Sequence, residues 1–144
     1  MTNSMNKPPI WFWILSVLAL IWNALGVQKY LQQAYNTEGF RASYTTEQLA
    51  LMDSTPAWAT AAFAVAVFGS VLACILLLLR KKLAKTVFLI ALIAIIVQMG
   101  YGLLIAKNYE VLSSFEVTMS IFVPIIGLLL YLFAKRSAEK GWIN

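Results

Sequence analysis

Four long apolar runs, separated by polar segments, dominate the hydrophobic pattern of this chain. A helix of about 20 apolar residues crosses a hydrocarbon core of about 30 Å. Each run has about that length and carries no charged residue, so the pattern predicts four transmembrane helices. We expect the spans at about residues 10–27, 56–79, 86–106 and 117–134. Joined in sequence order, they predict a single all-α domain over residues 1–144, arranged as an antiparallel up-down bundle.

The first run also has features of a secretory signal peptide. Lys7 precedes the apolar stretch, and the small-residue segment Ala24-Leu25-Gly26 follows near its end. Trp11, Trp13 and Trp22 favour a retained span instead, because tryptophan anchors transmembrane helices at the two membrane interfaces. We therefore interpret this run as the first transmembrane helix.

The longest polar segment, residues 28–55, follows the first span and is expected to be partly helical. The helical period continues through Tyr30 and Ala34, so the first helix should project beyond the membrane surface. Thr45 and Gln48 have the spacing of a capping box, which predicts a further short helix. This segment either covers one end of the bundle or forms a lid or docking surface.

A group of cations between the second and third runs predicts how the chain is oriented. The group consists of Arg80, Lys81, Lys82 and Lys85. Loops rich in Lys and Arg stay in the cytoplasm, because moving their charges across hydrocarbon is costly. With this group inside, eight of the 11 Lys and Arg residues lie inside, and only Lys29, Arg41 and Lys107 lie outside. We therefore expect both termini in the cytoplasm and residues 28–55 outside.

The amino-acid composition limits the kinds of binding partner and of site chemistry that we expect. The chain is 61% apolar and only 12% charged, with a net charge of +5. Because most cations flank apolar runs, this charge indicates contact with anionic lipid at the cytoplasmic face and not nucleic-acid binding. The single cysteine, Cys74, excludes an intrachain disulfide and a CxxC pair, and histidine is absent. We expect no metal and no cofactor, since the commonest metal ligand is missing.

Small side chains recur every four residues along the second span. They are Ala62, Ala66, Ser70 and Cys74. Apolar helices gain little from the hydrophobic effect when they associate in lipid, so close approach across small residues holds them together. This stripe is the predicted helix-packing surface, and Cys74 is interpreted as a small packing residue.

Two carboxamides are predicted at one depth in the membrane. Asn23 in the first span and Gln98 in the third both lie roughly 18–20 Å from the cytoplasmic boundary. Pro124 lies near that depth in the fourth span and frees the carbonyl of Ser120, since proline has no N–H. With Tyr101 as a cover, these residues would form a small polar binding pocket. Alternatively, the two carboxamides only hydrogen-bond between helices.

The residues within the predicted spans bear on which classes of function we expect. No acid, Lys or Arg lies within a predicted span, which argues against a proton-coupled carrier. No Ser/His or Cys/His pair supports catalysis, so no catalytic residue is predicted and an enzyme is the third choice. The first choice is an accessory or structural membrane protein acting through helix packing and its external segment. The second is a passive or facilitated carrier of small solutes with its site at Asn23 and Gln98. A homo-oligomer or larger membrane complex fits both, because four helices alone enclose little volume.

Several motifs distributed over nearly the whole chain carry a family resemblance. They are Asn6-Lys7-Pro8-Pro9-Ile10-Trp11-Phe12-Trp13, Trp22-Asn23, Pro56-Ala57-Trp58, the block Leu76 to Lys82, and Gly141-Trp142. With these motifs the chain resembles a family of small four-helix proteins of the bacterial inner membrane, some of which carry a sugar-transporter label. The resemblance implies a multi-pass protein of the bacterial cytoplasmic membrane and supplies no catalytic residues.

Overall fold

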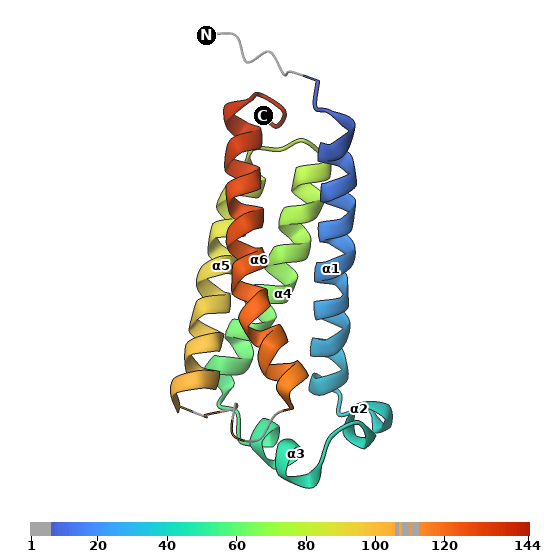
Figure 1. Cartoon of the computed structure of the whole chain (residues 1–144), viewed down its shortest axis with the longest axis vertical. Helices are drawn as coiled ribbons and strands as arrows, with labels where there is room; N and C mark the ends of the chain where they lie inside the picture. The colour runs from blue at the N-terminus through green and yellow to red at the C-terminus, as the bar shows by residue number, and fades with distance from the viewer. Residues whose placement is uncertain (1–6, 106, 108–109, 111–112) are drawn as a thin grey trace.

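Four long helices run alternately up and down along one axis, as the computed structural model shows (Figure 1). It describes residues 7–105, 107, 110 and 113–144, and these residues form no strand. The elements are α1 (Ile10–Ala34), α2 (Glu38–Ala42), α3 (Thr46–Asp53), α4 (Ala57–Leu78), α5 (Leu83–Gly100), the π-helical turn η1 (Tyr101–Ile105) and α6 (Ser114–Glu139). Helices α2 and α3 lie at one end of the bundle, here called the loop end. The C-terminus lies at the other, the tail end (Figure 1).

The structure confirms an all-α chain with four helices long and apolar enough to cross a membrane. These are α1, α4, α5 together with η1, and α6, with mean hydropathies between 2.0 and 2.7. Helix α4 lies within its predicted span of 56–79, whereas α1, as expected, and also α5 and α6 extend beyond theirs, because a helix continues past the last apolar residue when its polar turns still form backbone hydrogen bonds. Thus α1 continues to Ala34, α5 begins at Leu83, and α6 runs from Ser114 to Glu139. The expected end of the third span at residue 106 lies outside the described residues.

Side-chain caps define the two short helices of the loop end. Thr37 caps α2, and the predicted capping box at α3 is confirmed. There the Gln48 N–H donates to Thr45 Oγ1 over 3.1 Å, and the Thr45 N–H donates to Gln48 Oε1 over 3.0 Å. An ion pair between Arg41 and Asp53, with 3.3 Å between Nη2 and Oδ2, joins α2 to α3. These local bonds give the segment between α1 and α4 a defined shape.

Helices α4 and α5 form the centre of the bundle, because α4 packs against α1 and α5, and α5 packs against α4 and α6. Of the small-residue stripe, Ala66, Ser70 and Cys74 are buried and Ala62 is half-buried. Next to the stripe, a Cβ placed on Gly69 would lie only 3.5 Å from Cβ of Ala91 on α5. The two backbones therefore approach closely because the side chains between them are small.

Large aromatic rings join α1 to α6 at the tail end. Phe12 is fully buried and its ring centroid lies 5.6 Å from that of Phe133. Trp11 packs edge-on against Trp142 with centroids 5.2 Å apart. The backbones of α1 and α6 approach each other little, so bulky side chains, and not close helix packing, bridge this pair.

The C-terminal tail is bound to the turn between α4 and α5. Arg80 Nε donates to the Trp142 carbonyl over 2.8 Å, and the Asn144 N–H donates to the Arg80 carbonyl over 2.9 Å. Arg80 adopts a φ of 59°, a left-handed conformation that is uncommon for residues other than glycine. Ile143 is buried between these contacts, with 2% of its surface exposed. The cation predicted to mark topology therefore also holds the tail.

Replacing Ala66 with Leu should lower the free energy of unfolding by about 1–3 kcal/mol, because the added carbons overfill a close contact. The matched control is Ala61→Leu, the same change on an exposed position of the same helix. Thermal unfolding in detergent measures both variants. Equal losses of stability would place the packing surface elsewhere on α4.

Candidate functional site

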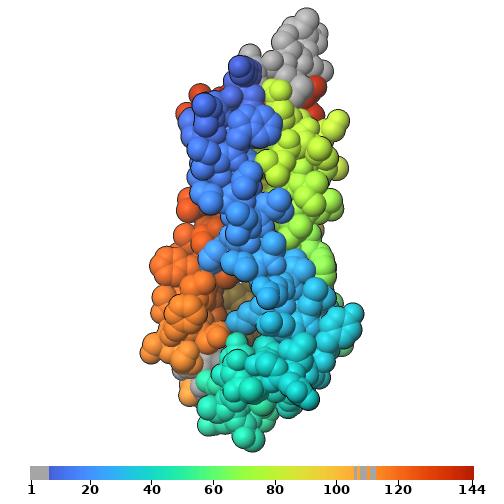
Figure 2. Space-filling view, turned by 90° about the vertical axis from the view of Figure 1, so that its right-hand side faces the viewer, coloured from blue at the N-terminus to red at the C-terminus, as the bar shows by residue number. Residues whose placement is uncertain are grey.

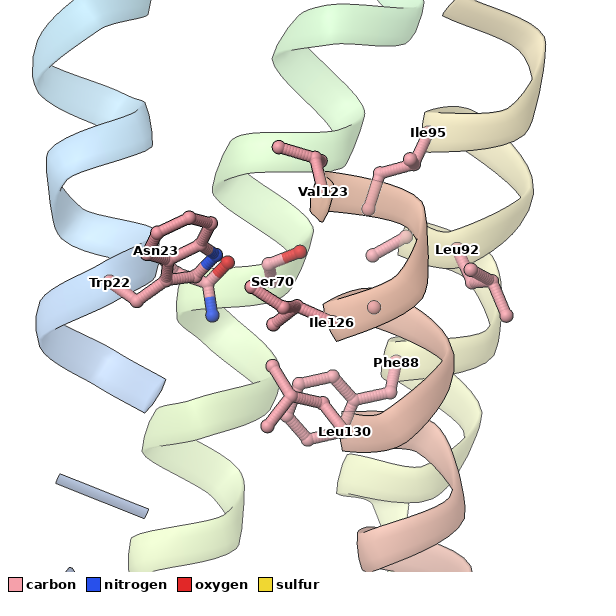
Figure 3. Close-up of a pocket in the computed structure, with 11 residues that line it drawn as sticks. Trp22, Asn23, Ser70, Phe88, Leu92, Ile95, Val123, Ile126 and Leu130 are labelled. Carbon is pink, nitrogen blue, oxygen red and sulfur yellow. The ribbon is translucent and has the colours of Figure 1, made fainter. Parts of the chain in front are cut away.

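A cavity of about 20 Å³ lies in the middle of the bundle, where all four long helices contribute to its wall (Figure 3). That volume is room for roughly one water molecule. The wall is mostly apolar, with Phe88, Leu92 and Ile95 from α5 and Val123, Ile126 and Leu130 from α6. Asn23 and Ser70 add polar groups from α1 and α4. Among the residues that the structure describes, no charged side chain lines this cavity.

Asn23 is half-buried and already hydrogen-bonded. Its Nδ2 donates to the Ala19 carbonyl over 2.9 Å and to Sγ of Cys74 over 3.4 Å. The second bond joins α1 to α4, so the carboxamide contributes to helix packing as well as lining the cavity. Beside it, a Cβ on Gly127 of α6 would lie 3.2 Å from Cδ1 of Ile95. The small volume thus follows from close approach of α6 to α5.

The other residues of the predicted polar pocket do not line this cavity. Gln98 is half-buried, and its side chain forms no hydrogen bond with the described residues. Tyr101 packs edge-on against Trp58 with centroids 5.3 Å apart. The exposed Ser120 hydroxyl donates to the Glu116 carbonyl over 2.9 Å, and α6 continues through Pro124. The predicted constellation is therefore not assembled around Asn23.

A larger cleft of about 330 Å³, which we call the outer cleft, lies at the loop end. The last turns of α1, the region of α2 and the first turn of α6 form it, with lining residues Leu25, Gln28, Lys29, Gln32, Gly39, Phe40, Ser43, Tyr44 and Glu116. Figure 2 shows a hollow between α1 and α6 in the half of the molecule nearer α2 and α3. No pattern in the sequence predicted this cleft.

Three side chains from separate parts of the chain meet in the outer cleft. Lys29 Nζ of α1 lies 3.0 Å from Oε2 of Glu116 on α6, and the Tyr44 hydroxyl donates to Glu116 Oε1 over 3.0 Å. The Lys29 side chain is 47% exposed and that of Glu116 21% exposed. The ion pair thus bridges α1 and α6 at the loop end, where their backbones remain apart.

The Tyr44 hydroxyl acts as a donor in this group. Burial raises the pKa of Tyr44, and the charge of Glu116 raises it further while the charge of Lys29 opposes that rise. The ordinary pKa of tyrosine already lies well above physiological pH, so the phenol is protonated. Tyr44 therefore donates to one oxygen of Glu116 while Lys29 donates to the other.

Two signals in the sequence point to parts of this group. Ser113 and Glu116 are three residues apart, as at a capped helix start, and the Ser113 hydroxyl does accept from the Glu116 N–H over 3.2 Å. Lys29 lies on the helical turns expected to project beyond the first span. Both signals place a charge at the loop end, but neither shows that the two charges meet, because they lie on helices far apart in sequence.

Comparison with protein-family models, curated proteins and solved structures finds no match to this chain. The described residues include no group of three or more His, Cys, Asp or Glu side chains placed to hold a metal ion. Four helices long and apolar enough to cross a membrane support a multi-pass α-helical membrane protein, with a nearly filled interior and a polar cleft at one end.

Replacing Asn23 with Leu should lower the free energy of unfolding by about 0.6 kcal/mol, the average for hydrogen bonds between spans. Gln98→Leu is the control and should leave stability unchanged, since that side chain forms no hydrogen bond with the described residues. A Cys74→Ala background should reduce the effect of Asn23→Leu, because the interhelical acceptor is then absent. Thermal unfolding in detergent provides the measurement. An Asn23→Leu variant as stable as the parent would mean that water, and not packing, satisfies this amide.

Proposed function

We propose that this chain is a non-catalytic accessory component of the bacterial cytoplasmic membrane that acts through helix packing and its external segment. The observation that supports the proposal is the contrast between the interior cavity and the outer cleft. The interior cavity of about 20 Å³ leaves little room for a solute, whereas the outer cleft of about 330 Å³ is lined by polar side chains. Small-ligand sites commonly have volumes of about 300–1,000 Å³.

The external segment supports this role by its construction. Capped helices and the Arg41–Asp53 ion pair shape it, and Tyr44 attaches it to Glu116 of α6. A segment held in this way offers a fixed surface to a partner. A homo-oligomer or a larger membrane complex suits such a component, because the lipid-facing sides of its helices are long and apolar.

A facilitated carrier of small solutes is the second candidate. It is favoured by the loose pairing of α1 with α6, which meet through rings at the tail end and through the Lys29–Glu116 pair at the loop end. Separation of these two helices would enlarge the cavity at Asn23. The apolar wall of that cavity makes a polar solute a poor fit and places this candidate second.

The orientation that we propose puts the tail end in the cytoplasm. Arg80, Lys81, Lys82 and Lys85 lie there, together with the cations of the last turns of α6. Their charges would remain on the cytoplasmic side and contact anionic lipid headgroups. The outer cleft then faces the periplasm.

Single cysteines placed at the two ends test this orientation. Ala50→Cys should react with a membrane-impermeant maleimide in intact cells, while Leu83→Cys should react only after the membrane is opened. Both positions are exposed, and native Cys74 is buried. If only Leu83→Cys were labelled in intact cells, the chain would have the opposite orientation to the one proposed.

Solute flux distinguishes the two candidate functions. Vesicles of phosphatidylcholine and phosphatidylglycerol that contain the purified chain should take up radiolabelled sugars and amino acids no faster than protein-free vesicles. Uptake that exceeds this background, and that Asn23→Leu abolishes while Gln98→Leu does not, would establish the carrier and displace the accessory role.

A further inference from the structure

The outer cleft contains one positive and one negative charge in direct contact. Lys29 Nζ donates to Glu116 Oε2 over 3.0 Å, and the ammonium has three N–H donors in all. A ligand with a single charge would be repelled by one member of this pair. A ligand carrying both charges avoids that conflict, because its anion can bind Lys29 while its cation binds Glu116, and the site stays neutral.

Uncharged polar groups beside the ion pair extend this recognition. Gln28 and Gln32 lie one helical turn apart on α1, line the cleft, and form no side-chain hydrogen bond with the described residues. Each carboxamide offers two donors and one acceptor oxygen. The Ser43 hydroxyl already donates to the Gly39 carbonyl over 2.9 Å and keeps its capacity to accept. The cleft can therefore bind both anionic oxygens and ammonium N–H groups.

The level of the cleft matches the surface of a bilayer. Lys29 lies about 29 Å along the helix axis from Ile10, the start of α1, which is close to the thickness of a hydrocarbon core of about 30 Å. Leu25, one turn nearer the middle of the bundle, lines the same cleft and is 58% exposed. A charged headgroup in the cleft would thus have apolar surface directly beneath it. Lys29, whose side chain is 47% exposed, borders the cleft together with Leu25, so a lipid can reach the cleft from the membrane side.

The aromatic residues of the cleft select among cationic groups. Phe40 is 6% exposed and packs against Tyr44 with ring centroids 5.0 Å apart, so these rings contact each other. They form no open cage of the kind that binds quaternary ammonium. The Glu116 carboxylate and the Gln28 and Gln32 amide oxygens instead accept hydrogen bonds, which a primary ammonium can donate.

From this geometry we propose that the outer cleft binds the headgroup of a phospholipid with a primary ammonium, as in phosphatidylethanolamine. Lys29 binds the phosphate, Glu116 binds the ammonium, and Leu25 contacts the start of an acyl chain. This proposal deepens the proposed function, on which it rests for the placement of the cleft at the membrane surface. The lipid would hold α1, α6 and the external segment together, as an additional ligand shared by three elements.

Lipid binding to the purified full-length chain tests the proposal. Dioleoyl phosphatidylethanolamine should raise the thermal unfolding midpoint in detergent by about 3 °C more than dioleoyl phosphatidylcholine. In competition followed by native mass spectrometry, the ethanolamine lipid should be retained about tenfold over the choline lipid, because choline lacks the N–H donors for a charge-assisted bond. Lys29→Gln and Glu116→Gln should each remove this preference.

Matched variants separate binding from structural support. Lys107→Gln and Glu47→Gln remove exposed charges at the same end but outside the cleft, and both should keep the preference. If the ion-pair variants do not fold, the double variant Gln28→Leu/Gln32→Leu still tests the site. It breaks no hydrogen bond to the described residues and should weaken binding of the ethanolamine lipid about fivefold.

Three results would overturn the proposal. The first is equal stabilisation of the parent by the two lipids, or a preference for choline. The second is an unchanged lipid preference in Lys29→Gln and Glu116→Gln despite lower midpoints, which would leave only a structural ion pair. The third is soluble glycerophosphoethanolamine replacing the lipid fully, which would identify a water-soluble ligand. None of these results changes the solute flux expected in vesicles free of ethanolamine lipid. The flux experiment therefore tests the proposed function independently of lipid binding.

Discussion

Close packing across small side chains is the constraint on which the rest of the structure depends. Apolar helices in lipid gain little hydrophobic free energy by associating, so they are held by dispersion forces and by the hydrogen bonds between them. Helix α4 satisfies this constraint with Ala66, Ser70 and Cys74, and α5 presents Ala91 opposite Gly69. The central positions of α4 and α5 follow, since each of them packs closely against two neighbours.

The pair of α1 and α6 is held by side chains instead, and the outer cleft lies between these helices at the loop end. Bulky rings such as Phe12 and Phe133 keep the two backbones apart at the tail end. At the loop end a long ion pair, Lys29 to Glu116, bridges the remaining distance. Gly127 of α6 lies close to Ile95 of α5, and the interior is nearly filled there, whereas the outer cleft lies at the loop end beside the Lys29–Glu116 pair.

The polar side chains of this fold lie where hydrogen-bond partners are close to them. Asn23 of α1 donates to the Ala19 carbonyl within its own helix and to Sγ of Cys74 on α4. These hydrogen bonds reduce the cost of burying an amide in an apolar interior. The charged groups are placed at the two ends, where Arg80 binds the tail and Glu116 binds Lys29 and Tyr44. Ion pairs and charged hydrogen bonds therefore lie at the two ends of the molecule, while the interior side chains mainly pack the helices together.

The sequence by itself determined the features that depend on neighbouring residues. The four apolar runs specified the four long helices, and the Thr45–Gln48 spacing specified the start of α3. Counting along a helix also gives depth, which is why Asn23 and Gln98 were expected at one level. Only the tertiary structure decided which way each side chain faces, because the rotation of a helix about its axis is set by its packing contacts. That rotation places Asn23 on the interior cavity without Gln98, and it brings Lys29 and Glu116 together from opposite parts of the chain.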